Sequence, residues 1–338
     1  MVRTGILGAS GYTGAELLRL AVGHPELDVA YATADSMAGT RAGDLYPSVA
    51  GAYPDLTFET FDPSAVDGLD LLFLALPHGT SMALMPDLQK RVGTIVDLAA
   101  DFRLKDPSLY PTWYGETHTA PELLADFAFG IPELFREEIQ GASLVAAAGC
   151  YVTAAALALA PLVRGGVVEP TGIVVDAASG VSGAGRALKH TTHFGTANED
   201  FTAYGLLTHR HTPEIEQATG AQVLFTPHLA PMTRGILATC YARPTAATST
   251  PQLLDVLHAA YDREPFVLVR DEPPSTKATL GSNAAHVTVR HDERTGWVVA
   301  LCALDNLVKG ASGQAVQCAN LALGLDESAG LTMVGVYP

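Results

Sequence analysis

Three glycines, Gly8, Gly11 and Gly14, constrain the fold of this chain more than any other feature. They lie between an apolar run, Val2–Leu7, and a segment of helical character, Ala15–Val22. In this context the glycines let the backbone turn tightly and approach a pyrophosphate at a helix N-terminus. The turn therefore predicts a dinucleotide site. The other residues of the turn that we expect at this site are Ser10, Tyr12 and Thr13.

The alternation of strands and helices continues beyond this turn. Strands are predicted at Leu27–Ala34, Leu69–Leu76 and Thr94–Leu98, and a helix is predicted at Ser81–Arg91. The run Leu69–Leu76 is continuously apolar, which is typical of a parallel strand buried on both faces. This pattern predicts a doubly wound parallel sheet of the Rossmann type.

The second half of the chain has a different texture, with long, partly alternating strands joined by extended polar segments. The predicted strands are Gly172–Ala178, Val223–Pro227, Gly235–Ala242 and Trp297–Leu304, and the predicted helices are Asp255–Ala260 and Ala311–Leu323. We therefore expect an α/β protein of two domains. Residues 1–148 with 307–338 would form the Rossmann domain, including a returning C-terminal helix. Residues 149–306 would form an α+β catalytic and oligomerisation domain with a mixed or antiparallel sheet.

The charge balance restricts the partners. Lys and Arg number 20 against 36 Asp and Glu, a net charge of −16. This surface would repel nucleic acid and anionic membranes, so an anionic ligand must be held by local positive groups. The four cysteines form no CxxC pair, and no apolar run approaches the roughly 20 residues that span a bilayer. We expect a cytoplasmic protein without disulfides that acts on a small molecule.

One cysteine stands in an unusual context. Cys150 follows Gly149 and precedes a predicted helix, Tyr151–Val163. Unpaired N–H groups and the dipole at a helix N-terminus favour a thiolate, as a nucleophile requires. The residues alone leave open a buried, inert cysteine. The other cysteines, which lie in apolar or small-residue runs, are Cys240, Cys302 and Cys318.

Histidines form two clusters, His190 with His193 and His209 with His211. They lack the compact ligand set of a known zinc pattern, so we expect no metal. The sequence Thr212–Glu214 has the features of a helix start, with Thr as N-cap and Pro at the first position. His211 would then lie just outside the helix, where a neutral imidazole could exchange a proton with a thiol. A surface or capping histidine is the alternative.

Arginines in loops are candidates for anion binding, because the guanidinium fork suits carboxylate and phosphate. They are Arg103, Arg186, Arg210 and Arg234. Surface salt bridges are the alternative role. The glycine-rich segment Ser179–Arg186 follows a strand and could offer backbone donors to a ligand. At the end of the second strand, Asp35 favours NAD and Arg41, near Ser36, favours NADP, so these residues do not decide between the two.

Seven motifs occur in an order that resembles one family. They are Gly8-Ala-Ser-Gly-Tyr-Thr-Gly14, Leu76-Pro-His-Gly79, Ala100-Asp-Phe-Arg103, Gly149-Cys-Tyr151, Ser179-Gly-Val-Ser-Gly-Ala-Gly-Arg186, His209-Arg-His-Thr-Pro-Glu-Ile215 and Leu304-Asp-Asn-Leu-Val-Lys-Gly310. The chain resembles the N-acetyl-gamma-glutamyl-phosphate reductases of arginine biosynthesis, within the aspartate-semialdehyde dehydrogenase superfamily. The match covers nearly the whole chain. One departure is Val152, where many members carry proline.

The resemblance implies NADPH-dependent reduction of N-acetyl-gamma-glutamyl phosphate to the 5-semialdehyde, with release of phosphate, through a cysteine thioester. It implies that Cys150 is the nucleophile and His211 the acid/base, with His209 as the alternative. Substrate anions would be held by Arg103, Arg186 and Arg210. The cofactor would be lined by the Gly8–Gly14 turn, Ser36, Arg41, Pro77, Ser182, Gly183 and Asn306.

Other functions remain open from the sequence. Within the superfamily they are an aminoadipyl-phosphate reductase that acts on a carrier-protein-linked substrate, and aspartate-semialdehyde dehydrogenase. Outside it they are an NADP redox sensor without turnover and a metal-dependent hydrolase. The long apolar strands of the second domain predict a homo-oligomer, a dimer or a tetramer.

Overall fold

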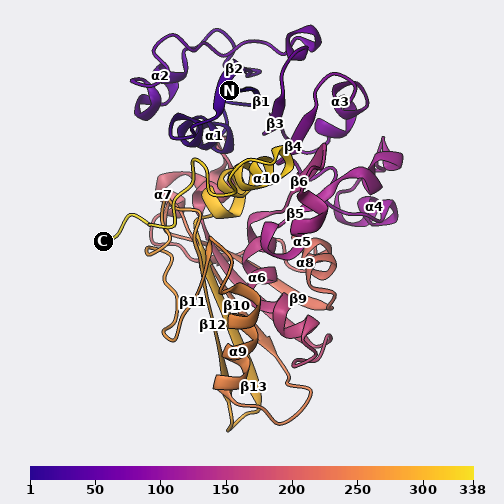
Figure 1. Cartoon of the computed structure of the whole chain (residues 1–338). Coiled ribbons are helices and arrows are strands. Elements are labelled where there is room, and N and C mark those ends of the chain that lie inside the picture. The colour runs from indigo at the N-terminus through magenta and orange to yellow at the C-terminus, as the bar shows by residue number, and fades with distance from the viewer. The chain divides into compact units, whose positions relative to one another are not determined.

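The computed structural model describes all 338 residues (Figure 1), and they separate into two compact units. Unit 1 comprises Met1–Ala148 and Ala311–Leu331, and unit 2 comprises Gly149–Gly310 and Thr332–Pro338. The sequence pattern placed the boundary between the second domain and the returning C-terminal segment at residues 306/307. The segment up to Gly310 stays with unit 2, where the Asp305 carboxylate accepts the following backbone N–H groups.

Unit 1 contains a six-stranded sheet in the order β2-β1-β3-β4-β6-β5, and every neighbouring pair is parallel. Its strands are β1 (Val2–Leu7), β2 (Leu27–Ala32), β3 (Leu71–Leu74), β4 (Thr94–Asp97), β5 (Ala128–Gly130) and β6 (Leu144–Ala147). Its helices are α1 (Tyr12–Val22), α2 (Ala42–Leu45), α3 (Ser81–Leu88), α4 (Tyr110–Trp113), α5 (Pro132–Ile139) and α10 (Gly313–Leu323). The predicted Rossmann-type sheet is confirmed.

The strand order defines where a ligand can bind unit 1. From β1 the chain moves to β2 on one side and then to β3 on the other. In open parallel sheets a crevice forms at such a reversal, outside the carboxyl ends of the strands. The glycine turn follows β1, and Pro77 follows β3. All four residues of β3 are buried, as the apolar run predicted.

The helix α10 belongs to unit 1. It packs against β4, α5 and α1. It begins at Gly313 rather than Ala311, because a π-helical turn, Val308–Ser312, comes directly before it. Such turns are rare and frequently lie at functional sites.

Unit 2 contains a seven-stranded sheet in the order β11-β12-β13-β10-β7-β9-β8. Its strands are β7 (Ile173–Gly180), β8 (Thr202–Ala203), β9 (Val223–Ala230), β10 (Ile236–Ala242), β11 (Val267–Val269), β12 (Ala285–Asp292) and β13 (Trp297–Leu304). Its helices are α6 (Cys150–Arg164), α7 (Phe194–Ala197), α8 (His211–Thr219) and α9 (Thr250–Tyr261). The pairs β7–β9 and β11–β12 are parallel and the others antiparallel, so the sheet is mixed, as predicted.

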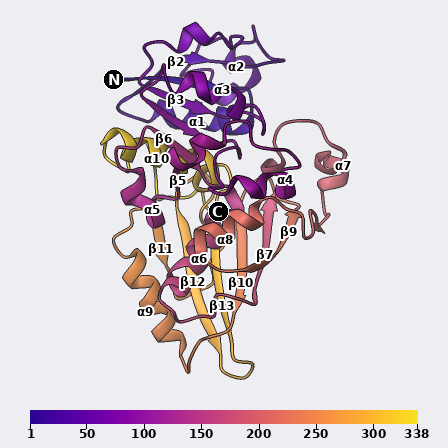
Figure 2. The ribbon, with the colours of Figure 1, turned by 90° about the vertical axis from the view of Figure 1, so that its right-hand side faces the viewer.

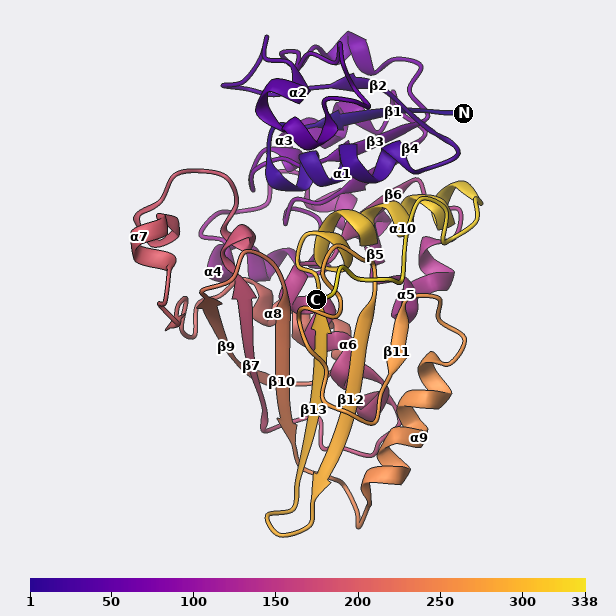
Figure 3. The ribbon, with the colours of Figure 1, turned by 90° about the vertical axis from the view of Figure 1, so that its left-hand side faces the viewer.

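Helices cover one face of this sheet. The helix α6 packs on β10 and β13, α9 packs on β12, and α8 packs on β9 (Figure 2). Along β10 buried residues alternate with half-buried ones, because successive side chains point to opposite faces. Figure 3 shows the opposite face, formed by the strands. Residues Tyr151–Leu162 of α6 are buried on every side, which explains their small and apolar side chains.

None of the helices combines the length and the apolar character needed to cross a membrane.

Candidate active site

The first residue of α6 is Cys150. Strand β6 ends at Ala147, and Gly149 is the N-cap of α6 with extended backbone (φ −66°, ψ 151°). The thiol of Cys150 is therefore attached to the first helical turn, beside backbone N–H groups that have no partner within the helix. Cys150 is partly exposed, whereas the other three cysteines are buried, and none of the four forms a disulfide. Burial raises the pKa of Cys240 far above its usual range.

A pocket of about 410 Å³ in unit 2 opens onto this cysteine. It brings together five residues predicted from the sequence, namely Cys150, Gly183, His209, Arg210 and His211. The other lining residues are Tyr151, Ser179, Ala184, Lys189, Thr191, Thr202, Tyr204 and Leu229. Two of the lining residues, Lys189 and Arg210, carry a positive charge, so this part of an acidic protein is suited to an anionic ligand.

His211 lies against the start of α6. A Cβ built on Gly149 would come within 2.4 Å of His211 Nε2, so only a glycine lets the ring approach this closely. The sequence predicted Thr212 as the N-cap of α8, and this was wrong by two residues. The helix begins at His211, with Arg210 as N-cap, because His209 Nδ1 accepts the His211 N–H at 3.1 Å.

His209 has a different environment from His211. Its ring packs edge-on against Tyr151, Tyr204 and Phe225. Burial, with a smaller contribution from the charge of Arg210, lowers the pKa of His209 to about 4. The ring is therefore neutral at neutral pH, and its Nδ1 is engaged as an acceptor.

A buried carboxylate also faces the start of α6. Glu214 is 0% exposed, and its Oε2 accepts the Gly149 N–H at 3.2 Å. Glu214 follows His211 by three positions on α8, so both side chains lie on one face of that helix. One short helix thus places an imidazole and a carboxylate against the backbone that carries Cys150.

Two tyrosines form part of the pocket wall. The Tyr204 hydroxyl donates to the Tyr151 hydroxyl at 3.2 Å, and Tyr151 donates to the His228 carbonyl at 2.8 Å. Burial raises the pKa of Tyr204 to about 12 and that of Tyr151 further still. Both therefore stay neutral and offer hydroxyl groups. Sequence reasoning missed Tyr204 and Lys189, because neither belongs to a motif that marks a site.

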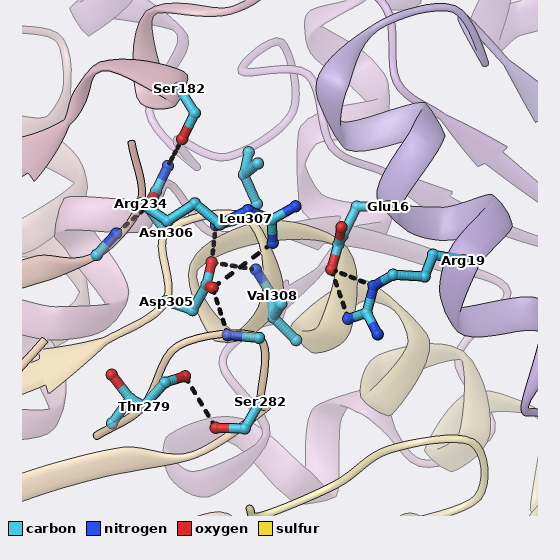
Figure 4. Close-up of polar contacts among 12 residues, drawn as sticks. Glu16, Arg19, Ser182, Arg234, Thr279, Ser282, Asp305, Asn306, Leu307 and Val308 are labelled. Carbon is cyan, nitrogen blue, oxygen red and sulfur yellow. Dashed lines mark hydrogen bonds and ion pairs between the residues drawn. The ribbon is translucent and has the colours of Figure 1, made fainter. Parts of the chain in front are cut away.

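The segment after β13 is arranged by Asp305, which is 0% exposed (Figure 4). Its Oδ1 accepts the N–H groups of Leu307 (2.8 Å) and Val308 (3.2 Å), and its Oδ2 accepts that of Gly281 at 2.7 Å. The Arg234 guanidinium lies 3.5 Å from Oδ2. The Gly310 N–H donates to the Asp305 carbonyl.

This arrangement brings Gly310 against Cys150. A Cβ built on Gly310 would lie 2.8 Å from the Cβ of Cys150. The first turn of α6 is therefore enclosed by backbone on this side, which fixes the position of the cysteine.

Three residues predicted to contact a cofactor lie together in unit 2. Asn306 donates from Nδ2 to Ser182 Oγ at 2.9 Å, and its Oδ1 accepts the Gly235 N–H at 2.8 Å. A Cβ on Gly183 would lie 3.7 Å from the same Asn306 Nδ2. Asn306 thus holds the turn that contains Ser182 and Gly183.

The glycine turn of unit 1 has the geometry of a dinucleotide cradle. Gly8 has φ +81°, and a Cβ there would meet the Ala75 carbonyl at 2.3 Å. A Cβ on Gly14 would lie 2.5 Å from the Ala9 Cα, so Gly14 permits close packing of α1. At Gly11, the N-cap of α1, the nearest atom is 3.5 Å away, which leaves room for a phosphate at the helix start. These residues fit a bound dinucleotide.

The remaining predicted residues occupy separate places. Ser36 and Arg41 follow β2, and Arg41 pairs with Asp44 at 2.9 Å. Arg103 follows β4 in unit 1, is 7% exposed and donates to the Leu98 carbonyl at 2.7 Å. Arg186 is half-buried and is absent from the lining of the pocket around Cys150. The chain has no group of three or more His, Cys, Asp or Glu side chains placed to hold a metal ion.

Known proteins resemble the chain along its whole length. A semialdehyde dehydrogenase NAD binding domain matches residues 3–142, and a semialdehyde dehydrogenase dimerisation domain matches residues 150–306. N-acetyl-gamma-glutamyl-phosphate reductase from Symbiobacterium thermophilum is 49% identical, over 100% of this chain and 99% of that protein. The same reductase from Desulforudis audaxviator is 48% identical, over 100% of both. The chain belongs to the N-acetyl-gamma-glutamyl-phosphate reductase family. The resemblance inferred from the motifs is confirmed.

Solved structures share the fold at low sequence identity. Aspartate semialdehyde dehydrogenase II from Vibrio cholerae is 16% identical, with a TM-score of 0.72 over 96% of this chain and 98% of that one. Aspartate semialdehyde dehydrogenase from Candida albicans is also 16% identical, with a TM-score of 0.66 over 95% and 98%. A parallel sheet joined to a mixed sheet is thus the architecture of the semialdehyde dehydrogenases.

Proposed function

We propose that the chain reduces N-acetyl-gamma-glutamyl phosphate to N-acetylglutamate 5-semialdehyde and phosphate, with NADPH, in arginine biosynthesis. The observation that carries the proposal is the placement of Cys150 at the first position of α6, with the His211 ring beside it in a pocket that also contains Lys189 and Arg210. Full-length identity of 48–49% to reductases of that name supports the choice of substrate.

Cys150 is the nucleophile in this proposal. Its sulfur attacks the acyl carbon, the bond from that carbon to the phosphate oxygen breaks, and phosphate leaves with the bonding electrons. The acyl group is then held as a thioester. N–H groups at the start of α6, which have no acceptor one turn earlier in the helix, stabilise negative charge at the sulfur and on the developing oxyanion. Glu214 fixes the Gly149 end of this turn.

When bound, a nicotinamide cofactor would supply the hydride that reduces the thioester. The Gly8–Gly14 turn would hold the pyrophosphate of that cofactor, and Ser182, Gly183 and Asn306 would line the rest of it. For NADP, the 2′-phosphate requires a positive group near the end of β2, and Arg41 is the candidate. Arg41 would then exchange its partner Asp44 for the phosphate.

His211 is the acid/base in this proposal. It takes the proton from the Cys150 thiol as the sulfur attacks. When the reduced oxyanion intermediate collapses, the carbon–oxygen double bond of the aldehyde forms, the carbon–sulfur bond breaks, and His211 returns the proton to the departing sulfur. His209 is less suited to this task, because its pKa is lowered to about 4 and its Nδ1 accepts the His211 N–H. We assign His209 to positioning His211.

Cationic side chains would hold the substrate. Lys189 and Arg210 line the pocket and can bind the carboxylate or the phosphate, and Arg103 and Arg186 remain the further candidates from the sequence. Tyr204 and Tyr151 offer hydroxyl groups to the acetamido group or the acyl oxygen.

Thiol activation alone accounts for little of the rate. Lowering a thiol pKa from about 8.5 to about 6.5 raises the thiolate fraction at pH 7 about 25-fold. The loss of nucleophilicity removes about 8-fold of this, so the net gain is about 3-fold. Alignment of the substrate (up to about 7–11 kcal/mol) and oxyanion donors (about 3–4 kcal/mol each) therefore dominate.

We also propose that the protein is a homo-oligomer. The family model that matches residues 150–306 is named as a dimerisation domain. Sedimentation velocity would test this directly, because a single monomeric species at assay concentrations would contradict it.

The test of the function is a steady-state assay in the easier, oxidative direction. Phosphate-dependent reduction of NADP⁺ is measured with the semialdehydes of N-acetylglutamate, of carrier-linked aminoadipate and of aspartate, and again with NAD⁺. We expect the highest kcat/KM with the N-acetylglutamate compound and NADP⁺. Cys150→Ser should abolish turnover but leave NADP binding unchanged. Turnover with none of the three, despite NADP binding, would favour a redox sensor.

A further inference from the structure

A buried carboxyl pair in unit 1 joins the loops that follow β3 and β4. Asp97 ends β4 and Asp101 lies in the loop after it, and both are 0% exposed. Ser81, the first residue of α3, is also 0% exposed. Its Oγ lies 2.8 Å from Oδ2 of Asp97 and 2.8 Å from Oδ2 of Asp101. No step proposed above uses these three residues.

The two contacts of Ser81 require a second proton. A serine hydroxyl has one hydrogen and can donate to one carboxylate only. If both carboxyl groups were ionised, one of the two contacts between Ser81 Oγ and a carboxylate oxygen would have no hydrogen between its two oxygens. Such a contact is costly in a buried site. One of the two carboxyl groups must therefore be protonated and donate to Ser81 Oγ, while Ser81 donates to the other.

The remaining partners decide which carboxyl carries the proton. Asp101 accepts the Gly79 N–H at 2.9 Å and the Met82 N–H at 3.0 Å, and His78 Nδ1 contacts its Oδ1. Asp97 accepts only the Ala99 N–H at 2.9 Å besides Ser81. Asp101 is thus the ionised acceptor and Asp97 the protonated donor.

The direction of the pKa shifts agrees with this assignment. Burial, and then the charge of Asp101, raise the pKa of Asp97 to about 7. Burial would also raise the pKa of Asp101, but the donors from His78, Gly79, Met82 and Ser81 outweigh it and lower that pKa to about 2.

The pair is connected to Arg103, the substrate-binding candidate of unit 1. Arg103 follows Asp101 by two positions, and its charge acts on Asp97. The Asp101 carbonyl accepts from His118 Nε2 at 2.8 Å and from the Tyr110 hydroxyl, which fixes the backbone just before Arg103. An ionised Asp97 would attract the guanidinium and compete with a substrate anion for it.

We propose that protonated Asp97 is a positioning residue, which through Ser81 and Asp101 keeps the loops after β3 and β4 together and leaves the charge of Arg103 available to the acyl-phosphate substrate. The proposal rests on the proposed function for the role of Arg103. Loss of the Asp97 proton places a second negative charge in the pair and weakens substrate binding, so KM rises with pH while cofactor binding through the glycine turn does not change.

Few other charged groups face this pair. His78 contacts Asp101, and its Nε2 lies 2.8 Å from Oε1 of Glu116. Tyr114 stacks on the His78 ring with centroids 4.5 Å apart. The neighbouring strands β3 and β6 and the packed helix α10 bring no Asp, Glu, Lys, Arg or His, and the one acid of α3, Asp87, is exposed.

The first experiment compares Asp97→Asn with the wild type, measuring KM for N-acetylglutamate semialdehyde from pH 6 to 9. The asparagine amide can donate to Ser81 Oγ and accept from the Ala99 N–H, so it imitates the protonated carboxyl. Above pH 7 we expect the wild-type KM to rise by up to tenfold per pH unit relative to the variant, with kcat and the Kd for NADP unchanged between them. The ratio removes the ionisation of the substrates themselves. Parallel KM profiles would overturn the proposal.

A matched control removes one negative charge elsewhere in unit 1. Asp87→Asn alters an exposed carboxylate that pairs with Arg91, and its pH profile should follow the wild type.

A second measurement needs neither a variant nor activity. In wild-type protein labelled with ¹³C at the aspartate carboxyl, one resonance should remain protonated at pH 6 and titrate near pH 7. Complete ionisation of every aspartate by pH 5.5 would overturn the proposal, whatever the enzyme's substrate proves to be. If the resonance titrates but none of the three semialdehydes is turned over, the buried pair stands and the proposed function fails.

Discussion

Gly149 offers the sharpest test of the active-site geometry. An alanine Cβ at this position would lie 2.4 Å from Nε2 and 2.8 Å from Cδ2 and Cε1 of His211, whereas ordinary contact begins at 3.4 Å. The imidazole ring must therefore retreat by about 1 Å. The backbone of Gly149 (φ −66°, ψ 151°) suits any residue, so Gly149→Ala should fold normally.

The expected loss follows from this displacement. A 1 Å misplacement of a reacting group can cost about 100-fold, and complete loss of acid–base catalysis costs about 10²–10⁴-fold. We therefore expect kcat of Gly149→Ala to fall about 100-fold in the oxidative assay, or about 3 kcal/mol in transition-state stabilisation. The Kd for NADP should stay within twofold, because the glycine turn belongs to unit 1.

Two comparisons isolate the cause. Gly23→Ala adds a Cβ whose nearest neighbour is 3.8 Å away, also on a backbone with negative φ, and should retain wild-type kcat. In a double-mutant cycle with His211→Asn, the Gly149→Ala effect should largely disappear, since the ring it displaces is already gone. Wild-type kcat in Gly149→Ala, or full additivity with His211→Asn, would refute the proposed contact between His211 and the start of α6.

Three further results are expected. Gly310→Ala places a Cβ 2.8 Å from the Cβ of Cys150. This variant should lower kcat at least tenfold and slow the alkylation of Cys150 by iodoacetamide. An unchanged alkylation rate would contradict the enclosure of the first turn of α6. His209→Asn keeps an acceptor for the His211 N–H. Because the pKa of His209 is lowered to about 4, the pH dependence of kcat/KM near neutral pH should be the same in this variant as in the wild type. A shift of that pH dependence would return the acid/base role to His209. The pKa of Asp97 is raised to about 7, from 3.8, so the native state retains a proton that the unfolded chain releases. The contribution of this group to the free energy of unfolding therefore falls as pH rises from about 4 to about 7. Urea denaturation should therefore show Asp97→Asn gaining up to about 4 kcal/mol relative to the wild type between pH 4 and pH 7.5, and no gain would contradict the raised pKa.

Features with a local physical cause were predictable from the sequence. The Gly8–Gly14 turn is recognised because its glycines follow an apolar strand and precede a helix in the sequence. The positive φ of Gly8 and the close packing of Gly14 on Ala9 are local requirements of this turn. Cys150 could be placed at a helix start because Gly149 and the small residues of α6 define that start. Buried strands such as β3 are visible as continuous apolar runs.

Features that depend on distant contacts were not predictable. Strand β12 (Ala285–Asp292) escaped prediction, because its polar residues Thr288 and Arg290 interrupt the apolar pattern and its pairing with β13 sustains it. Lys189 and Tyr204 line the pocket although neither belongs to a motif that marks a site. The carboxyl pair Asp97–Asp101 is evident only once folding places Ser81 between them.

The same limit applies to the histidine pair. The sequence pattern Thr212–Glu214 predicted the start of α8 two residues late, because it could not include the bond from the His211 N–H to His209 Nδ1. That bond distinguishes the two histidines, which the sequence alone left equivalent.

Capture of the covalent intermediate tests the central claim most directly. The enzyme is mixed with N-acetylglutamate semialdehyde and NADP⁺ in the absence of phosphate, quenched in acid, and studied by peptide mass spectrometry. We predict a burst of one NADPH per active site and an N-acetylglutamyl thioester on the peptide that carries Cys150. NADPH formation without acylation of Cys150, or with acylation at another residue, would contradict the account.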